Sequence, residues 1–389
     1  MMAGTGPETD GARITAMRVL LLHNRYRSPG GEERAVGDLA ALLRARGHAV
    51  RVLERCSAEL GRFGAARALI GGGDDPAEVG EAARAFGAEV VHAHNLHPRF
   101  GWRALAAARA AGARTVLHLH NFRLFCAIAI GYRDGAPCFR CRGRDTRPGL
   151  RLCCRGSVGE AAAYAAGLHL QQPHLLEHTD AFVAVSGATA SRLIGLGLPG
   201  LRTTAIQNFV PAAQFAPATD ADRGRYALAS GRLVAEKGFD TAIAAARGAE
   251  VPLVIAGAGP DEARLRALSA GADVRFAGRL DPGSLADLRR GAAVALVPSR
   301  WEEPCPYAVL DAMADGVPVL ASDRGGLPEL VGAAAALPAQ DGGAWTRALD
   351  ELWRDPSLRS RHGADALARA RQRFSEDLFY RRLMAVYSG

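Results

Sequence analysis

Short apolar runs alternate with longer amphipathic segments along the first half of the chain. Residues 18–23 are almost continuously apolar, a Gly30-Gly31 turn follows, and residues 32–46 repeat apolar positions with helical spacing. A continuous apolar run is typical of a strand buried on both faces of a parallel sheet. Further runs of this kind, with helical segments between them, stand at residues 49–53, 89–93, 114–120 and 181–186. The pattern predicts a doubly wound α/β domain over residues 17–212.

A second strand–helix series begins after residues 208–225, a stretch rich in Pro, Ala, Gln and Asp that lacks periodicity. Its predicted strands are residues 226–230, 252–256, 274–277, 293–297 and 317–321. We therefore predict a second domain over residues 213–370 and a terminal segment, 371–389, whose helix crosses back to the first domain. Two Rossmann-like, doubly wound domains would face each other across a cleft at the carboxyl ends of their strands, where open α/β sheets bind ligands.

The composition agrees with an α/β protein that has no membrane span. Hydrophobic residues make up 49% of the chain, yet no apolar run reaches the roughly 20 residues needed to cross a bilayer. Residues 1–16 lack the basic start and apolar core of a signal peptide, so we expect a cytoplasmic location. The net charge of +8 suits an anionic nucleotide, and peripheral association with the inner face of a membrane stays open. Without an aromatic-interleaved basic cluster, no nucleic-acid partner is expected.

Lys237 is the only lysine in a chain with 48 basic Lys and Arg residues. It stands close to Arg232, where a predicted strand turns into a helix. An ammonium is a compact point charge and a guanidinium is a planar fork, so the two are not interchangeable at a crowded anion. These two cations would neutralise a departing diphosphate. The alternative interpretation is a solvated helix start in a gene that encodes most cations as Arg.

Residues 300–314 form the most specific acidic motif of the chain. Pro306 suits a first helical turn, because its missing N–H would have no partner there. The N–H groups of Tyr307 and Ala308 would then be free to bind an anion. Glu303 lies in the loop before this helix and Asp311 further along it, positions suited to sugar hydroxyls and a ribose diol. Taken alone, the two acids would equally suit an ordinary protein surface.

Two features of the first domain would face the same cleft. The turn at Gly30 and Gly31 places backbone N–H groups at a helix N-terminus, which is a phosphate site or simply a turn. His120 ends a predicted strand, as His92 and His94 end the preceding one, and an imidazole there can donate to a sugar hydroxyl or a phosphate. His118 is interpreted as a packed structural residue.

Together these segments resemble the retaining nucleotide-sugar glycosyltransferases of family 4, which have the GT-B fold. The resemblance rests on Ser28-Pro-Gly-Gly-Glu-Glu33, the His-Asn-Phe-Arg turn at His120, Gly-Arg-Leu-x-x-Glu-Lys-Gly, Ala256-Gly-Ala-Gly259, the acidic motif, and Ser322-Asp-Arg-Gly-Gly-Leu-Pro-Glu329. The chain departs from the family at Asp311, where Glu is usual, and at Cys305-Pro306, which replaces the commoner Phe-Gly.

The resemblance implies a role for each motif. Arg232 and Lys237 would hold the donor diphosphate, with Gly30 and Gly31 approaching it through the backbone. Glu303, assisted by the helix start at Pro306, Tyr307 and Ala308, would contact the donor sugar. Asp311 would bind the ribose, Arg279 would lie in the loop against the base, and His120 would meet the sugar or the acceptor. The expected donor is a UDP- or GDP-sugar, and no metal would be needed for catalysis.

The resemblance also sets the expected reaction. A hexose would pass with retained configuration to a hydroxyl of a glycan, a lipid-linked molecule or a small molecule, as in polysaccharide or cell-envelope biosynthesis. Two other functions stay open at this point. One is a nucleotide-sugar epimerase on the same fold, and the other is a non-catalytic scaffold that binds a nucleotide sugar.

An arginine-rich insert at about residues 123–156 contains a cluster of cysteines. Cys126, Cys138, Cys141 and Cys153 have the spacing C-x11-C-x2-C-x11-C, and Cys154 is adjacent. Two close thiolates and two distant ones suit a tetrahedral structural zinc. An iron–sulfur cluster, two disulfides or unligated thiols are the alternatives, although disulfides are rare in cytoplasmic proteins. A similar insert occurs in a subset of the resembled family.

Overall fold

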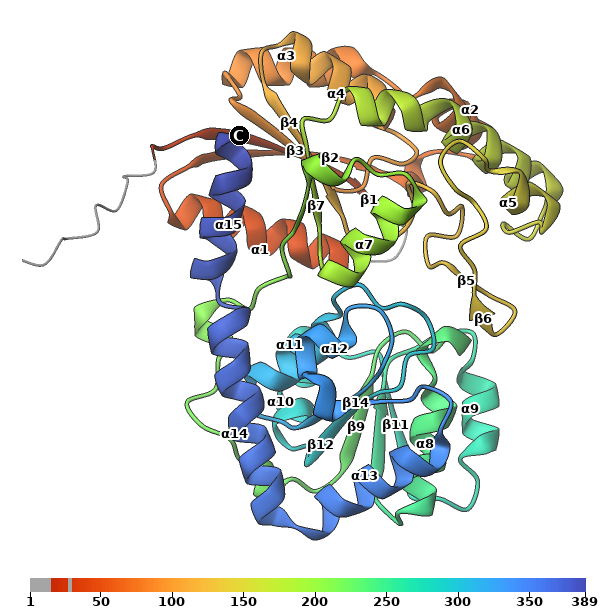
Figure 1. Cartoon of the computed structure of the whole chain (residues 1–389), viewed down its shortest axis with the longest axis vertical. Coiled ribbons are helices and arrows are strands. Elements are labelled where there is room, and N and C mark those ends of the chain that lie inside the picture. The colour runs from red at the N-terminus through yellow and green to blue at the C-terminus, as the bar shows by residue number, and fades with distance from the viewer. Residues whose placement is uncertain (1–14, 27–29) are drawn as a thin grey trace, which may run out of the picture.

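The computed structural model describes residues 15–26 and 30–389. Most of the opening stretch considered for a signal peptide, and Ser28 and Pro29 of the predicted glycine turn, lie outside these residues. Two α/β domains are stacked one above the other, and the C-terminal helices run along one side of both (Figure 1). The fold is the predicted arrangement of two Rossmann-like, doubly wound domains.

The N-terminal domain contains a six-stranded parallel sheet in the order β2-β1-β3-β4-β7-β8. Its strands are β1 (Arg18–Arg25), β2 (Ala49–Cys56), β3 (Val90–Ala93), β4 (Arg114–Leu119), β7 (Ala181–Ala184) and β8 (Thr203–Ala205). Its helices are α1 (Gly31–Ala45), α2 (Arg62–Gly71), α3 (Pro76–Phe86), α4 (Gly101–Ala110), α6 (Val158–Glu177) and α7 (Gly187–Leu196). The apolar run of β1 is fully buried, as expected for a central strand with helices on both faces.

The C-terminal domain repeats this design in the order β11-β10-β9-β12-β13-β14. Its strands are β9 (Ala227–Ser230), β10 (Leu253–Ala256), β11 (Val274–Gly278), β12 (Val294–Val297), β13 (Val319–Ser322) and β14 (Ala336–Leu337). Its helices are α8 (Phe239–Gly248), α9 (Glu262–Leu268), α10 (Pro282–Arg290), α11 (Tyr307–Ala314), α12 (Leu327–Val331) and α13 (Gly342–Arg354). The short edge strands β8 and β14 have too few residues for a recognisable apolar run, so the sequence did not reveal them.

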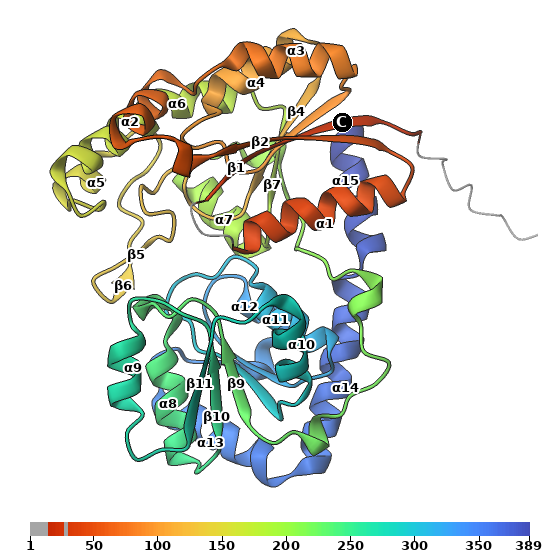
Figure 2. The same ribbon diagram turned by 180° about the vertical axis from the view of Figure 1, so that it is seen from behind.

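Two helices at the end of the chain connect the domains. Helix α14 (Pro356–Arg373) packs on the C-terminal domain, and α15 (Glu376–Ser388) lies beside α1 of the N-terminal domain (Figures 1 and 2). Phe379, Leu383 and Tyr387 of α15 belong to the same buried cluster as Val36 and Leu39 of α1. Part of the N-terminal core is therefore supplied by the last helix of the chain.

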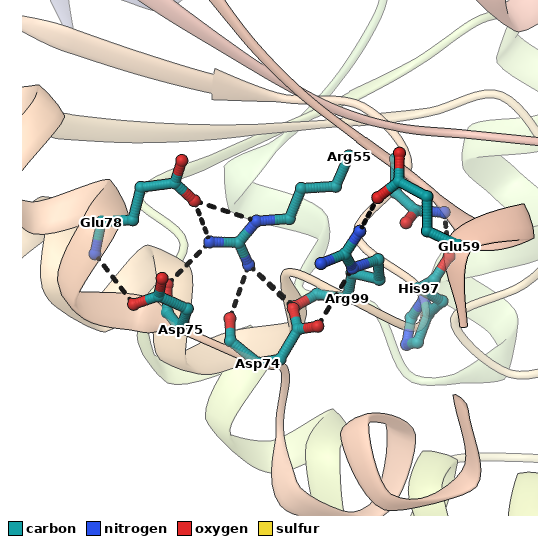
Figure 3. Close-up of polar contacts among 8 residues, drawn as sticks. Arg55, Glu59, Asp74, Asp75, Glu78, His97 and Arg99 are labelled. Atoms are coloured by element: carbon teal, nitrogen blue, oxygen red, sulfur yellow. Dashed lines mark hydrogen bonds and ion pairs between the residues drawn. The ribbon is translucent and has the colours of Figure 1, made fainter. Parts of the chain in front are cut away.

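A buried arginine fixes the loops at one end of the N-terminal sheet (Figure 3). Arg55, at the end of β2, donates to the carboxylate of Asp74 at 3.0 Å, to that of Glu78 at 2.5 Å and to the backbone oxygen of Arg99 at 3.1 Å. Arg99 in turn donates to the other Asp74 oxygen at 3.0 Å and pairs with Glu59. Because Arg55 is almost fully buried, these partners offset the cost of removing its charge from water.

The insert between β4 and α6 contains little regular structure. It holds the two-residue strands β5 (Tyr132–Arg133) and β6 (Ala136–Pro137) and the short helix α5 (Arg147–Arg151). The β5–β6 hairpin extends from the N-terminal domain toward the C-terminal domain in both views (Figures 1 and 2). Among the residues that the structure describes, no helix is both long enough and apolar enough to traverse a lipid bilayer.

Candidate functional site

The N-termini of α1 and α11 meet across the cleft. Arg34, on the first turn of α1, donates two hydrogen bonds to the Asp311 carboxylate at 2.7 and 2.9 Å. The Arg34 guanidinium also lies 4.0 Å from the centre of the Tyr307 ring. A Cβ at Gly31 would lie 3.4 Å from the same ring, an ordinary contact distance, so the glycine turn passes close to Tyr307. The predicted glycine turn and the predicted acidic helix therefore face each other.

Lys237 and Glu303 form an ion pair in the C-terminal domain. Glu303 is 2% exposed, and its Oε1 atom also accepts a hydrogen bond from Ser299 Oγ at 2.7 Å. The Lys237 ammonium lies 5.5 Å from the centre of the Trp301 ring. A buried carboxylate needs such partners, because an unpaired charge would lose its hydration without compensation. The structure thus brings together two residues that the sequence placed at the donor site.

Glycine backbones allow the loops around this pair to approach closely. Gly238 has φ +69°, and a Cβ there would lie 2.0 Å from the Pro298 carbonyl oxygen. Gly257, in the loop after β10, would place a Cβ 1.8 Å from the Gly231 carbonyl oxygen. These distances are too short for any side chain, so the Gly-Arg-Leu and Ala-Gly-Ala-Gly motifs pack against each other.

The other predicted donor residues lie at the same edge of this sheet. Arg232 is 65% exposed and makes only a 3.7 Å contact with Glu236, so it does not join the Lys237 pair. Arg279 is exposed immediately after β11. Pro306 is the residue before α11 rather than its first helical residue, and Tyr307 and Ala308 begin the helix. Their N–H groups have no intrahelical partner, as at every helix start.

The predicted histidine belongs to a stack of imidazoles. His120 Nε2 lies 2.9 Å from His94 Nδ1, and the His120 ring stacks on that of His118 at 4.4 Å. His92 lies deeper and contacts the Tyr387 hydroxyl at 2.7 Å, so it does not face the cleft as predicted. His118 and His120 are two positions apart and share one face of β4. His120 is the more exposed of the two because it follows the strand end.

Burial controls the charge of these histidines. It lowers the pKa of His118 to about 3 and holds the pKa of His94 and of His120 well below 6.5. The rings are therefore neutral at pH 7. Ligand nitrogens of His92, His94 and His118 lie within 4.8 Å of one another, yet the rings stack within 27° of parallel. Lone pairs in parallel ring planes do not converge on one metal ion.

Glu32 extends this histidine stack into a pocket of the N-terminal domain that the sequence did not reveal. The pocket walls include Glu32, His94, His120 and Arg123. Burial raises the pKa of Glu32, and the buried Arg123 guanidinium and His23 oppose this shift. Glu32 follows the predicted glycine turn directly, but only the fold shows that its side chain meets the strand that ends at His120.

Two further contacts across the domain interface involve residues without a predicted role. The Glu329 carboxylate accepts hydrogen bonds from the N–H groups of Gly187 at 2.9 Å and Ala188 at 2.5 Å, at the start of α7. Arg192 of α7 donates to both oxygens of Glu302 at 2.5 and 3.0 Å. Glu329 ends a motif that the sequence analysis quoted, so its position was visible and its partner was not. These contacts, with Arg34–Asp311, join the two domains.

Three of the four cysteines predicted as metal ligands line one pocket of the insert, together with Cys154. The pocket walls include Cys126, Cys138, Cys141 and Cys154. Cys153, the predicted fourth member, does not line this pocket; its neighbour does. Cys153 has φ +48° in the turn that follows α5. Of the two adjacent residues, Cys154 is the one that lines the pocket.

Each of the two domains matches a family model of glycosyltransferases. Residues 29–214 match the model described as Glycosyltransferase Family 4, and residues 213–369 match the model described as Glycosyl transferases group 1. The two matches meet in the segment that connects the sheets and together span most of the chain. The chain belongs to the glycosyltransferases of family 4.

Curated relatives match one part of the chain. A glycogen synthase of Mycobacterium tuberculosis is 34% identical over 192 residues, which cover 46% of this chain and 45% of the relative. A GDP-mannose-dependent monoacylated alpha-(1-6)-phosphatidylinositol monomannoside mannosyltransferase of Corynebacterium glutamicum is 32% identical over 170 residues, covering 40% and 45% of the two chains. The chain thus spans less than half the length of these relatives.

Solved structures match almost the whole chain. Anabaena HepE in complex with UDP and glucose superimposes with a TM-score of 0.64 at 18% identity, covering 96% of this chain and 99% of that one. Sucrose-phosphate synthase from Thermosynechococcus elongatus gives a TM-score of 0.69 at 20% identity, with 96% and 98% covered. At this level of identity the likeness establishes the fold.

Proposed function

We propose that this protein transfers a hexose from a nucleoside diphosphate sugar to a hydroxyl acceptor with retention of the anomeric configuration. The observation that carries the proposal is the Lys237–Glu303 pair, which lies at the carboxyl edge of the donor-side sheet. A buried carboxylate suits sugar hydroxyls, and the adjacent ammonium suits a diphosphate. The UDP and glucose in the Anabaena relative support a donor of this class.

In the proposed reaction, the bond between the anomeric carbon and the donor phosphate oxygen breaks. The acceptor oxygen forms the new bond on the same face, and its proton passes to the leaving phosphate. Lys237 and Arg232 stabilise the negative charge that develops on the diphosphate, an effect worth about 3 to 4 kcal/mol for a well-placed donor. Glu303, oriented by Lys237 and Ser299, accepts hydrogen bonds from the sugar.

The acceptor enters, in this proposal, beside His120 and Glu32. Their pocket lies in the N-terminal domain, opposite the donor residues of the C-terminal domain. A neutral His120 can accept or donate one hydrogen bond to a hydroxyl. A lipid-linked acceptor would bring the basic protein to the inner face of a membrane, and sedimentation with anionic vesicles tests this part of the proposal.

Thermal stabilisation by UDP, GDP, ADP and their common sugars tests the donor site. We expect one nucleotide to raise the melting temperature of the wild-type protein, and Lys237→Ala to lose most of this shift. Arg361→Ala, an exposed change on α14, is the matched control. Because Lys237→Ala leaves Glu303 buried without its cation, the double change Lys237→Met with Glu303→Gln removes both charges. Stabilisation that is equal in all four proteins would refute the proposed site.

Product analysis separates transfer from the rival activities. Incubation with the stabilising donor and a panel of glycan, lipid-linked and small hydroxyl acceptors should give a glycoside whose anomeric configuration matches that of the donor. Conversion of the donor to another nucleotide sugar would indicate an epimerase instead. Binding with neither product nor hydrolysis would indicate a scaffold.

Catalysis should proceed without a divalent cation, because Lys237 and Arg232 supply the positive charge at the diphosphate. We expect initial rates measured with EDTA to match those measured with Mg²⁺ or Mn²⁺. The control is a cation-dependent glycosyltransferase assayed in the same buffers. Strict dependence on either ion would contradict this assignment of charge.

A further inference from the structure

The insert gathers four sulfurs from separate parts of its sequence into one pocket. Cys126 follows the loop after β4, Cys138 and Cys141 follow the β5–β6 hairpin, and Cys154 follows α5. Apart from its thiols and arginines, the pocket is lined mainly by apolar residues such as Phe125, Phe139 and Leu196. The insert has only two-residue strands and one short helix, and its shape depends mostly on turn hydrogen bonds rather than on regular structure.

Backbone amides surround two of these sulfurs. The backbone N–H groups of Ile128, Ala129 and Gly131 lie near the Cys126 sulfur, and that of Gly149 lies near the Cys141 sulfur. A Cβ at Gly149 would lie 3.5 Å from the Cys141 sulfur, so this chain segment passes directly over it. The Arg133 guanidinium lies beside Cys154. Burial raises the pKa of the Cys126 and Cys141 thiols despite these neighbours, so binding of a metal would be coupled to release of the thiol protons.

We propose that Cys126, Cys138, Cys141 and Cys154 bind one structural Zn²⁺ ion and that Cys153 takes no part. Four thiols would release four protons and form a site of net charge −2, which Arg133 and Arg140 on the pocket wall would offset. Thiolates select zinc over magnesium or calcium. Among the residues that the structure describes, no three cysteine sulfurs lie within 4.8 Å of one another, so the side chains rotate inward about χ1 on binding.

Phe139 connects this zinc site to both sides of the cleft. It lies between Cys138 and Cys141, and its ring meets that of Phe122 edge to face at 5.0 Å. Arg192 lies over the Phe139 ring at 4.3 Å and binds Glu302, the residue before Glu303. The ion would therefore fix the loop after His120 and position it against the donor side. This positioning role rests on the proposed transfer, whereas the zinc site itself does not.

Metal content provides the test, independent of activity. We expect purified protein to contain one zinc per chain by plasma mass spectrometry, with Cys154→Ser reducing it at least tenfold. Cys153→Ser is the matched control, since it removes the adjacent sulfur and should leave zinc unchanged. Equal zinc in both variants would overturn the ligand assignment. Iron with visible absorption, or disulfides found by mass spectrometry without metal, would overturn the zinc site.

A second measurement on the wild-type protein guards against misfolded variants. Thiol titration with a mercurial reagent, in the presence of a zinc-sensitive dye, should release zinc as four thiols react together. Release after modification of the remaining thiols alone would overturn the proposal. If transfer is established, zinc loss should lower kcat at least tenfold and leave nucleotide-induced stabilisation intact. Loss of that stabilisation as well would overturn the positioning role on the acceptor side.

Discussion

At the scale of the residue, the most constrained group of the site is the Glu303 carboxylate. It is almost completely buried and relies on Lys237 and Ser299 for compensation. Removing one partner of such a buried pair costs about 3 to 5 kcal/mol, because the other charge remains unpaired. The only lysine of the chain therefore stabilises the fold locally and, in our proposal, serves the donor.

The first prediction concerns the chemistry of this cation. Lys237→Arg keeps the charge but replaces a compact ammonium with a planar fork, which does not fit the same contact with Glu303. We expect kcat/KM to fall by about 10²-fold to 10³-fold, the loss typical of a misplaced electrostatic donor. The reverse change Arg232→Lys, at an exposed position, should cost less than tenfold. Steady-state kinetics with the identified donor decides the matter, and equal activity of Lys237→Arg and wild type would contradict it.

The second prediction concerns pH and the buried histidines. Burial depresses the pKa of His97 and His118 to about 3 in the folded protein, against about 6.5 in an unfolded chain. The unfolded chain therefore binds more protons between these values. The stability is fully present above pH 6.5 and is lost as the pH falls toward 3, by about 1.4 kcal/mol per pH unit for each histidine.

Urea unfolding between pH 7.5 and 4.5 measures this loss. His118→Gln should reduce the number of protons taken up on unfolding by about one, because one titrating group is removed. The free energy of unfolding should then depend less steeply on pH. His362→Gln, an exposed change on α14, is the control and should leave the slope unchanged. A stability that stays constant from pH 7 to pH 5 would argue against neutral, buried histidines.

At the scale of the element, the N-termini of helices make the contacts that join the two domains. The N-terminus of α7 binds the carboxylate of Glu329 from α12, so the partial positive charge of one helix start meets an acid of the other domain. The N-termini of α1 and α11 are joined in the same region by Arg34 and Asp311. Helix starts of both domains therefore meet at the domain interface.

The third prediction tests the contact at α7. Glu329→Gln removes the negative charge and one of the two acceptors for the N–H groups of Gly187 and Ala188. We expect a loss of about 1.5 to 3 kcal/mol in the free energy of unfolding, the range for hydrogen bonds to a charged group. Glu351→Gln, an exposed change on α13, provides the control for loss of one charge. Chemical denaturation curves that coincide for the two variants would show that the contact adds nothing.

At the scale of the whole molecule, the last helix determines whether the N-terminal domain is complete. Helix α15 contributes Phe379, Leu383 and Tyr387 to a core whose other members come mainly from α1 and from strands β1, β3, β4 and β7. The two domains are therefore coupled through the chain itself as well as through the cleft. Loss of this helix would expose the face of α1 that it covers.

The fourth prediction measures this coupling. Leu383→Ala, at a fully buried position, should lower the free energy of unfolding by about 2 to 5 kcal/mol through lost burial and a new cavity. Arg381→Ala, an exposed change on the same helix, should have little effect. Differential scanning calorimetry should show the N-terminal transition moving to lower temperature. A Leu383→Ala transition identical to that of Arg381→Ala would mean that α15 does not stabilise this domain.

The sequence by itself determined the fold class and most strands, because apolar runs and turn glycines act locally. It also indicated Lys237, Glu303 and His120, whose neighbours form motifs of fixed spacing. It gave no sign that Arg34 binds Asp311, since these residues are 277 positions apart and meet only when two domains face each other. The pocket of Glu32 and His120 was hidden for the same reason.

The cysteines of the insert show the same contrast between sequence and tertiary structure for two adjacent residues. Spacing alone was enough to mark a cluster of thiols in the insert, because four cysteines close together are informative in any fold. Whether Cys153 or Cys154 completes the pocket was decided by the tertiary structure. Cys153 and Cys154 are adjacent, so their spacing to each of the other cysteines differs by only one residue. The sequence therefore does not indicate which of the two side chains points into the pocket, and the backbone conformation around Cys153 differs from that of an ordinary strand or helix.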